Sequence, residues 1–234
     1  MRLHHFTGEC ITTGVLSLEF LHREQAKQAA IQVAKPARVV LFPGTWNPPT
    51  IAHVDIANAA LQQADEVIWV MPRVLPHKSF DGPGFEARCR MVEALVRETP
   101  GFSAAVSEGG LYAEIADEAQ QHFGAGSEIV LAMGRDAAER IATWDYGRPG
   151  YFEEFIERYN LLVAARHGEY SPAPRHAASI SALPMESSWD GVSSSEVRRR
   201  IAVGEAWRDL VPRAIAQMVE SLYQEGSWKS RSGR

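Results

Sequence analysis

The sequence predicts an α/β fold, a Rossmann-like open parallel sheet with helices on both faces. Short apolar runs rich in β-branched residues alternate along the chain with longer segments of helical periodicity. These runs are apolar on consecutive positions, which is typical of strands buried on both faces of a parallel sheet. The chain has 234 residues, 45% of them hydrophobic, so it is long enough to bury a sizeable core.

The elements are expected in a regular order. A strand or hairpin arm (11–21) and a helix (22–34) come first. The strands that follow are expected at 37–44, 66–72, 102–107, 128–134, 160–166 and 180–183. Helices are expected at 50–63, 85–98, 111–123, 193–203 and 211–224, with short helices within 135–158. We therefore divide the chain into an N-terminal extension (1–36), a main α/β domain (37–225) and a basic tail (226–234) expected to be disordered.

Composition excludes several classes of protein. The formal charge of −5 argues against a generic nucleic-acid binder, and no apolar stretch approaches the ~20 residues of a membrane span. Glu9 and Glu19 interrupt the early apolar residues, so no signal peptide is expected. Cys10 and Cys89 allow at most one disulfide and no zinc cluster, which favours a reducing cytoplasm.

Ligands of such folds bind beyond the carboxyl ends of the strands, so the segment after the strand at 37–44 is the first candidate site. There the chain runs through Gly44, Thr45 and Asn47 into a helix start at Thr50. Free amides and the helix dipole favour an anion at such a start. Thr50 and His53 are three residues apart and share one face of the first turn. A phosphate chain suits this face, and a plain N-cap with a surface histidine is the alternative.

A second candidate is the segment Ser193-Ser194-Ser195-Glu196, which fits a capping box with Ser193 as the cap and Glu196 reaching back. The following turn carries the arginines 198–200. Helix dipole, amides and guanidinium groups there would converge on a polyphosphate. The alternative is a capped helix with a solvated basic face.

Further candidates follow other strands. Asp136, after Gly134, would accept hydrogen bonds from ribose hydroxyls or cap a helix. Lys78 lies in a loop rich in proline and glycine, and Arg166 ends a strand. Trp144 offers a flat face for stacking on a ring, although most tryptophans serve packing.

Four segments, in order, resemble a known family. Residues 44–53 resemble the (H/T)xGH signature of the nucleotidylyltransferase superfamily. Residues 72–78, the Gly134–Asp136 segment with Thr143-Trp144, and residues 192–198 resemble motifs of its bacterial nicotinate/nicotinamide mononucleotide adenylyltransferases. The resemblance covers roughly residues 37–225, and four motifs in order are far more specific than one.

The resemblance implies a Mg²⁺-dependent adenylyltransferase that joins ATP to nicotinic acid mononucleotide and releases pyrophosphate. Its partners would be ATP and a pyridine mononucleotide, with no nucleic acid or membrane, and homo-oligomerisation is left open. ATP phosphates and water would carry most of the Mg²⁺, because no carboxylate cage stands out in the sequence. The catalytic residues implied are His53, Thr50, Lys78 and Arg198. The nucleotide-binding residues implied are Gly44, Thr45, Asn47, Gly134, Asp136, Arg166, Ser193, Ser194 and Ser195, and the acceptor-binding residues are Trp144 and Tyr112.

The sequence also departs from the family pattern. Pro43 and Ala52 stand where glycine is common, and Asn47 stands where aspartate is common. Ala113, after Tyr112, removes a side-chain hydroxyl at the pyridine end of the expected site. Two alternatives therefore stay open: a related transferase acting on nicotinamide mononucleotide or another phosphate ester, and a nucleotide-binding protein without catalysis.

Overall fold

The computed structural model describes residues 18–23, 36–76, 81–165, 170–185, 189 and 191–224. Several expectations fall outside these residues. They are the first part of the strand expected at 11–21, nearly all of the helix expected at 22–34, the tail 226–234, and the side chains of Cys10, Lys78 and Arg166.

A seven-stranded sheet forms the centre of the molecule. Its strands in sequence are β1 (Glu19–His22), β2 (Arg38–Pro43), β3 (Glu66–Pro72), β4 (Phe102–Ser107), β5 (Glu128–Gly134), β6 (Asn160–Ala164) and β7 (Ile180–Leu183). Their order in the sheet is β1-β4-β3-β2-β5-β6-β7, and every neighbouring pair is parallel except β1 with β4. The predicted α/β class with a parallel sheet is confirmed.

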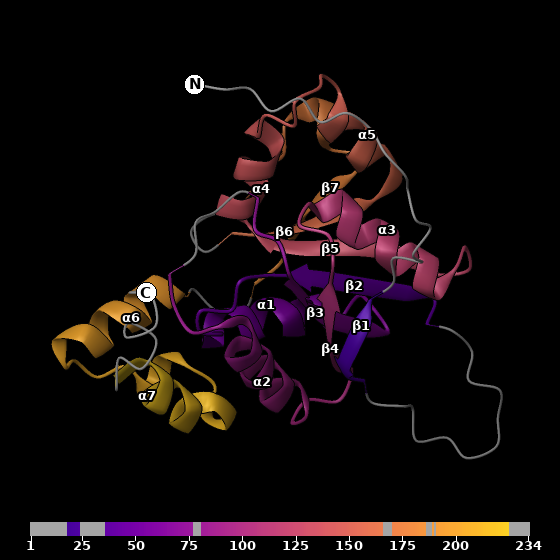
Figure 1. Cartoon of the computed structure of the whole chain (residues 1–234). Coiled ribbons are helices and arrows are strands. Elements are labelled where there is room, and N and C mark those ends of the chain that lie inside the picture. Colours follow the sequence, from indigo (N-terminus) through magenta and orange to yellow (C-terminus); the bar gives the residue numbers. More distant parts are fainter. Residues whose placement is uncertain are drawn as a thin grey trace, which may run out of the picture.

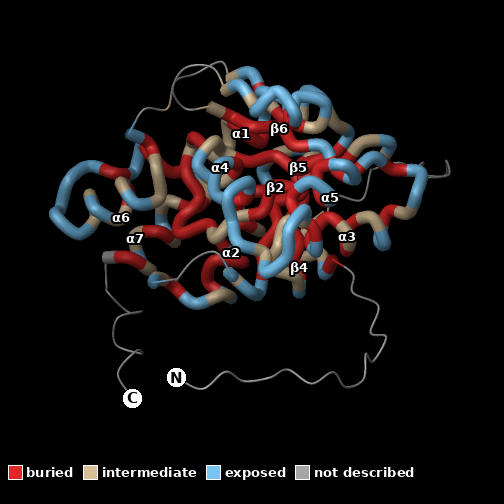
Figure 2. The backbone as a smooth tube through the Cα atoms, turned by 90° about the horizontal axis from the view of Figure 1, so that it is seen from above, coloured by how far each residue is buried: buried red, intermediate tan, exposed pale blue. Residues whose placement is uncertain are grey.

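Helices cover both faces of this sheet (Figure 1). One layer contains α1 (Ile51–Leu61), α2 (Phe85–Val96), α6 (Ser194–Val203) and α7 (Ala216–Gln224). The other contains α3 (Tyr112–Phe123), α4 (Arg135–Thr143) and α5 (Tyr151–Arg158). Alternate residues of β2 serve the two cores: Val40 and Phe42 pack in the first, Val39 and Leu41 in the second. The strands are accordingly buried between helices whose outer sides are exposed (Figure 2).

Residues 18–23 of the N-terminal extension pack against the sheet of the main domain. Its strand β1 pairs antiparallel with β4 at the edge of the sheet, and Leu18 before it is buried. Arg23 donates two hydrogen bonds to the carboxylate of Glu66 at 2.9 and 2.8 Å. Residues 18–23 therefore belong to the fold of the domain.

The chain order creates a switch point beside β2. From β2 the chain proceeds to β3 and β4 on one side, and β5 then pairs with the other side of β2. In open α/β sheets ligands bind at the carboxyl ends of the strands where the order reverses, so the site is expected beyond β2 and β5. No helix within the described residues is long and apolar enough to cross a membrane.

Candidate functional site

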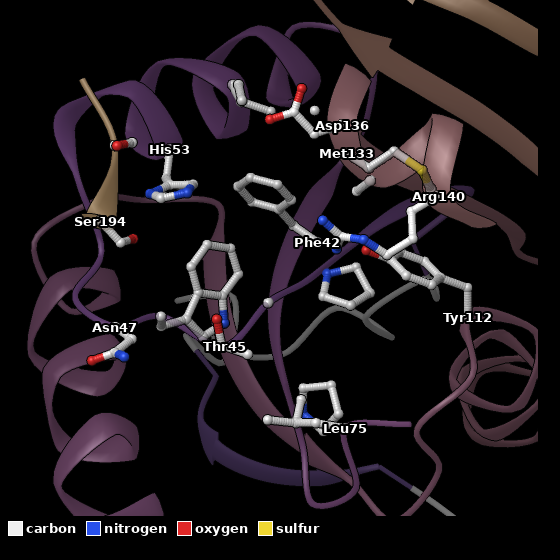
Figure 3. Close-up of a pocket in the computed structure, with 18 of the residues that line it drawn as sticks. Phe42, Thr45, Asn47, His53, Leu75, Tyr112, Met133, Asp136, Arg140 and Ser194 are labelled. Atoms are coloured by element: carbon white, nitrogen blue, oxygen red, sulfur yellow. The ribbon is translucent and has the colours of Figure 1, made fainter. Parts of the chain in front are cut away.

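A pocket of about 880 Å³ opens at this switch point. Its walls are the segments that follow β2, β3 and β5 together with the first turn of α6. Figure 3 shows its two ends. The α1–α6 end contains Asn47, His53, Ser194 and Arg198, and the α3–α4 end contains Tyr112 and Arg140. The pocket thus lies where the sheet topology predicts a ligand.

An aromatic cluster forms the floor under the α1–α6 end. The rings of Phe42 and Trp46 lie 4.9 Å apart, and those of Trp46 and Trp69 lie 4.6 Å apart. A side chain at Gly44 would place its Cβ 2.6 Å from the Trp46 indole, so only glycine fits there. The Gly44 N–H donates to the carbonyl of Val70. Gly44 therefore shapes the pocket wall while its own amide is used within the sheet.

The start of α1 fixes the orientation of His53. The Thr50 N–H donates to His53 Nδ1 at 3.0 Å, and the Thr50 hydroxyl lies 2.8 Å from the same nitrogen. Because a backbone N–H can only donate, Nδ1 is the acceptor and the proton of the neutral ring lies on Nε2. Thr50 is fully buried and does not line the pocket, whereas His53 does. In this structure Thr50 therefore orients His53 and is not exposed to a ligand.

Asn47 is held by the protein through both ends of its amide. Its Oδ1 accepts from the Tyr223 hydroxyl at 2.6 Å, and its Nδ2 donates to the carbonyl of Asp81 at 3.0 Å. An aspartate could make only the first of these contacts, because a carboxylate has no N–H to donate. The departure from the family pattern at this position thus supports a bridge between the pocket loop, Asp81 and α7.

The serine segment begins α6 largely as predicted. Ser193 caps the helix, since its Oγ accepts from the Glu196 N–H at 3.1 Å. The expectation that Glu196 reaches back to the cap is wrong. Its carboxylate accepts from Arg199 and Arg200 at 2.8 Å, and these contacts hold the pKa of Glu196 down to about 2. Neither arginine lines the pocket, so two of the three consecutive arginines serve the helix.

Arg198 is the arginine of this run that reaches the pocket. It donates to the carbonyl of Asn47 at 2.6 Å and to the Ser195 hydroxyl at 3.2 Å. The Ser194 hydroxyl donates to the carbonyl of Pro48 at 2.8 Å. These contacts bring the N-termini of α1 and α6 together at one end of the pocket. This end of the pocket is suited to phosphate groups, because it combines two positive helix N-termini with a histidine and an arginine.

The end of β5 supplies a further wall. Gly134 lines the pocket, and a Cβ there would meet nothing within 4 Å. Packing of the protein alone does not require that glycine, and the space beside it is open pocket. Asp136 follows in the first turn of α4, exposed at the pocket wall. The same pocket is lined by Thr45, Ser193, Ser194 and Ser195, and their contact with a nucleotide stays a prediction.

The α3–α4 end differs from the expected acceptor site. Tyr112 lines it as predicted, and burial raises the pKa of Tyr112 to about 12. Trp144 does not line the pocket. It borders a separate depression of about 500 Å³ beside the stacked rings of Tyr146 and Tyr151, with 37% of its surface exposed. Its stacking on the acceptor stays a prediction.

Arg140, which is absent from the residues predicted from the sequence, points into this end of the pocket (Figure 3). Arg140 lies four residues after Asp136 on α4, a spacing that puts both side chains on one helix face. The signal was therefore available in the sequence. The predicted sites Lys78 and Arg166 lie outside the described residues and have no structural account.

Comparison with known proteins agrees with this geometry. The profile of the cytidylyltransferase-like family matches residues 41–200. A protein named "Probable nicotinate-nucleotide adenylyltransferase" from Thermus thermophilus is 31% identical over 190 residues, covering 78% of this chain and 96% of that protein. One with the same name from Salinibacter ruber is 30% identical, covering 78% and 95%. The solved nicotinic acid mononucleotide adenylyltransferase of Plasmodium falciparum, complexed with NaAD, matches with a TM-score of 0.60 at 15% identity, covering 82% and 97%.

Proposed function

The chain belongs to the cytidylyltransferase-like family and to its nicotinate-nucleotide adenylyltransferases, and we propose that it joins ATP to nicotinic acid mononucleotide. The products are the dinucleotide and pyrophosphate. The observation that carries the proposal is the meeting of the α1 and α6 N-termini with His53 and Arg198 at one end of the pocket. That end suits the phosphates of both substrates.

In the proposed reaction the mononucleotide phosphate oxygen attacks the α-phosphorus of ATP in line. One P–O bond forms, the bond to the β-phosphate oxygen breaks, and the electron pair leaves with pyrophosphate. The nucleophile is already an anion, so no protein base or covalent intermediate is needed. Catalysis is then positioning together with stabilisation of charge.

The residues divide this work between them. His53 lines the pocket and offers its Nε2–H to phosphate oxygens, because Thr50 occupies Nδ1. The first turn of α6 offers backbone amides that have no partner within the helix, and Arg198 adds a fixed positive charge. Lys78 keeps its proposed role on the departing pyrophosphate, and Arg166 keeps its proposed contact with phosphate.

Magnesium is proposed to arrive with ATP. The described residues contain no group of three histidine, cysteine or acidic side chains placed to hold a metal ion. The carboxylates that line the pocket are Asp81 and Asp136. A Mg²⁺ ion carried by the ATP phosphates and water needs few protein ligands, and it would neutralise charge on the leaving pyrophosphate.

The proposal is tested by measuring pyrophosphate release from ATP with nicotinic acid mononucleotide as acceptor. The purified protein should turn over, and His53→Ala should lower kcat by ~10²–10³ while remaining folded. His122→Ala is the matched control, because this exposed histidine of α3 does not line the pocket. Nucleotide binding without pyrophosphate release would identify a non-catalytic protein. Near-normal turnover of a folded His53→Ala variant would remove the role given to His53.

A further inference from the structure

We propose that Arg140 binds the carboxylate of the acceptor's pyridine ring and so selects nicotinic acid mononucleotide over its amide. The inference rests on the proposed function and assigns the acid preference to one side chain. It starts from an exposed cation at the pocket wall: among the described residues, none accepts a hydrogen bond or ion pair from the Arg140 guanidinium. Its N–H groups are therefore available to a ligand in the pocket.

Arg140 lies at the end of the pocket where the pyridine ring of the acceptor is expected. Figure 3 shows Arg140 and Tyr112 extending to the same region, at the opposite end of the pocket from His53 and Ser194. The two side chains also interact electrostatically. Burial raises the pKa of Tyr112, and the positive charge of Arg140 lowers it in part. A mononucleotide with its phosphate at the α1–α6 end would extend its ring toward this pair.

The backbone donors just before Tyr112 are already in use. At the start of α3 the Gly110 and Leu111 N–H groups donate to Glu114 Oε2 at 2.9 and 3.0 Å. The Gly109 N–H donates to Glu118 at 2.7 Å. Ala113 provides no hydroxyl. Arg140 adds a charged donor to this end of the pocket, beside the N–H groups of the first turn of α3. Arg135, which also lines the pocket, lies five residues earlier at the start of α4.

The chemistry of the guanidinium supplies the discrimination. Its planar N–H groups match the two oxygens of a carboxylate in a bidentate pair. A carboxamide would present an NH₂ group, itself a donor, to one of those N–H groups and would carry no charge. The rest of the two acceptors is identical, so loss of the guanidinium should affect only the acid form.

The test compares kcat/KM for the two mononucleotides in Arg140→Met and Arg140→Lys. Hydrogen bonds to charged groups contribute ~1.5–3 kcal/mol, so Arg140→Met should lower the value for nicotinic acid mononucleotide by roughly 10–100-fold. The value for nicotinamide mononucleotide and the KM for ATP should stay near wild type. Arg140→Lys should recover part of the loss, since it keeps the charge but not the fork. Arg90→Met is the matched control, an exposed helical arginine outside the pocket.

A binding measurement separates this inference from the proposed function. Titration calorimetry with nicotinic acid mononucleotide, without ATP, should show weaker binding to folded Arg140→Met than to the wild type. An equal loss for both acceptors, or a raised KM for ATP, would overturn the inference while leaving the adenylyltransferase intact. A wild-type protein that binds the acid through Arg140 but releases no pyrophosphate would instead refute the proposed function alone.

Discussion

Replacing Tyr223 by phenylalanine tests whether α7 holds the loop that opens the site. The Tyr223 hydroxyl donates to Asn47 Oδ1 at 2.6 Å, and both residues are buried. Burial raises the pKa of Tyr223, so the phenol stays protonated and remains a donor. Tyr223→Phe leaves a buried amide oxygen without this donor, which should lower the free energy of unfolding by ~1–3 kcal/mol. In a chain of this size the melting temperature falls by ~2–4 °C for each kcal/mol.

Urea unfolding of Tyr223→Phe, Asn47→Ala and the double variant isolates the contact from other effects of each change. We expect the double variant to lose less stability than the sum of the single variants, by more than ~0.5 kcal/mol. Tyr151→Phe is the matched control, since no described residue hydrogen-bonds to its hydroxyl. Additive losses, or an unchanged Tyr223→Phe, would refute the idea that this hydrogen bond holds the loop.

The other predictions concern charge and the N-terminal extension. The pKa of Glu196 is lowered to about 2 from 4.5 by its hydrogen bonds to Arg199 and Arg200, so its contribution to stability is complete above pH 4.5 and is lost as the pH falls toward 2. Glu196→Gln should flatten this part of a stability–pH curve, and an unchanged slope would contradict the pairing. Deleting residues 1–23 should lower the melting temperature and expose the β4 edge, because β1 pairs with β4. Pyrophosphate release per folded molecule should survive this deletion, and its loss would show that the extension contributes to the site.

Elements defined by a local pattern are the ones that the sequence predicts well. The bounds expected for β3, β4, β5 and β7 are those observed. Each of these strands is a short, mainly apolar run whose burial depends on its own residues. The same holds for the site loops, because parallel strands bring their carboxyl ends to one edge of the sheet. The amino-acid sequence alone is therefore enough to group most of the described candidate residues at that edge, although Trp144 borders a separate depression.

Elements that depend on distant partners escape this reasoning. Strand β1 has four half-exposed or exposed residues and is defined by its pairing with β4, some 80 residues later. The helix expected at 211–224 begins only at residue 216. Pro212 holds the preceding residue Val211 extended, and a 3₁₀ turn at 213–215 separates it from α7. The hydrogen bond between Asn47 and Tyr223 joins residues 176 positions apart, so the sequence around Asn47 does not predict it.

The three consecutive arginines of α6 show how local and distant effects combine in one site. Successive residues of a helix point about 100° apart, so the three side chains cannot share one face. Glu196 lies three and four residues before Arg199 and Arg200, and it pairs with both. Arg198 is left to turn toward the loop after β2, where the Asn47 carbonyl accepts its hydrogen bond. The carboxylate thereby holds Arg199 and Arg200 at the helix surface, and Arg198 is the guanidinium of the run that lines the pocket.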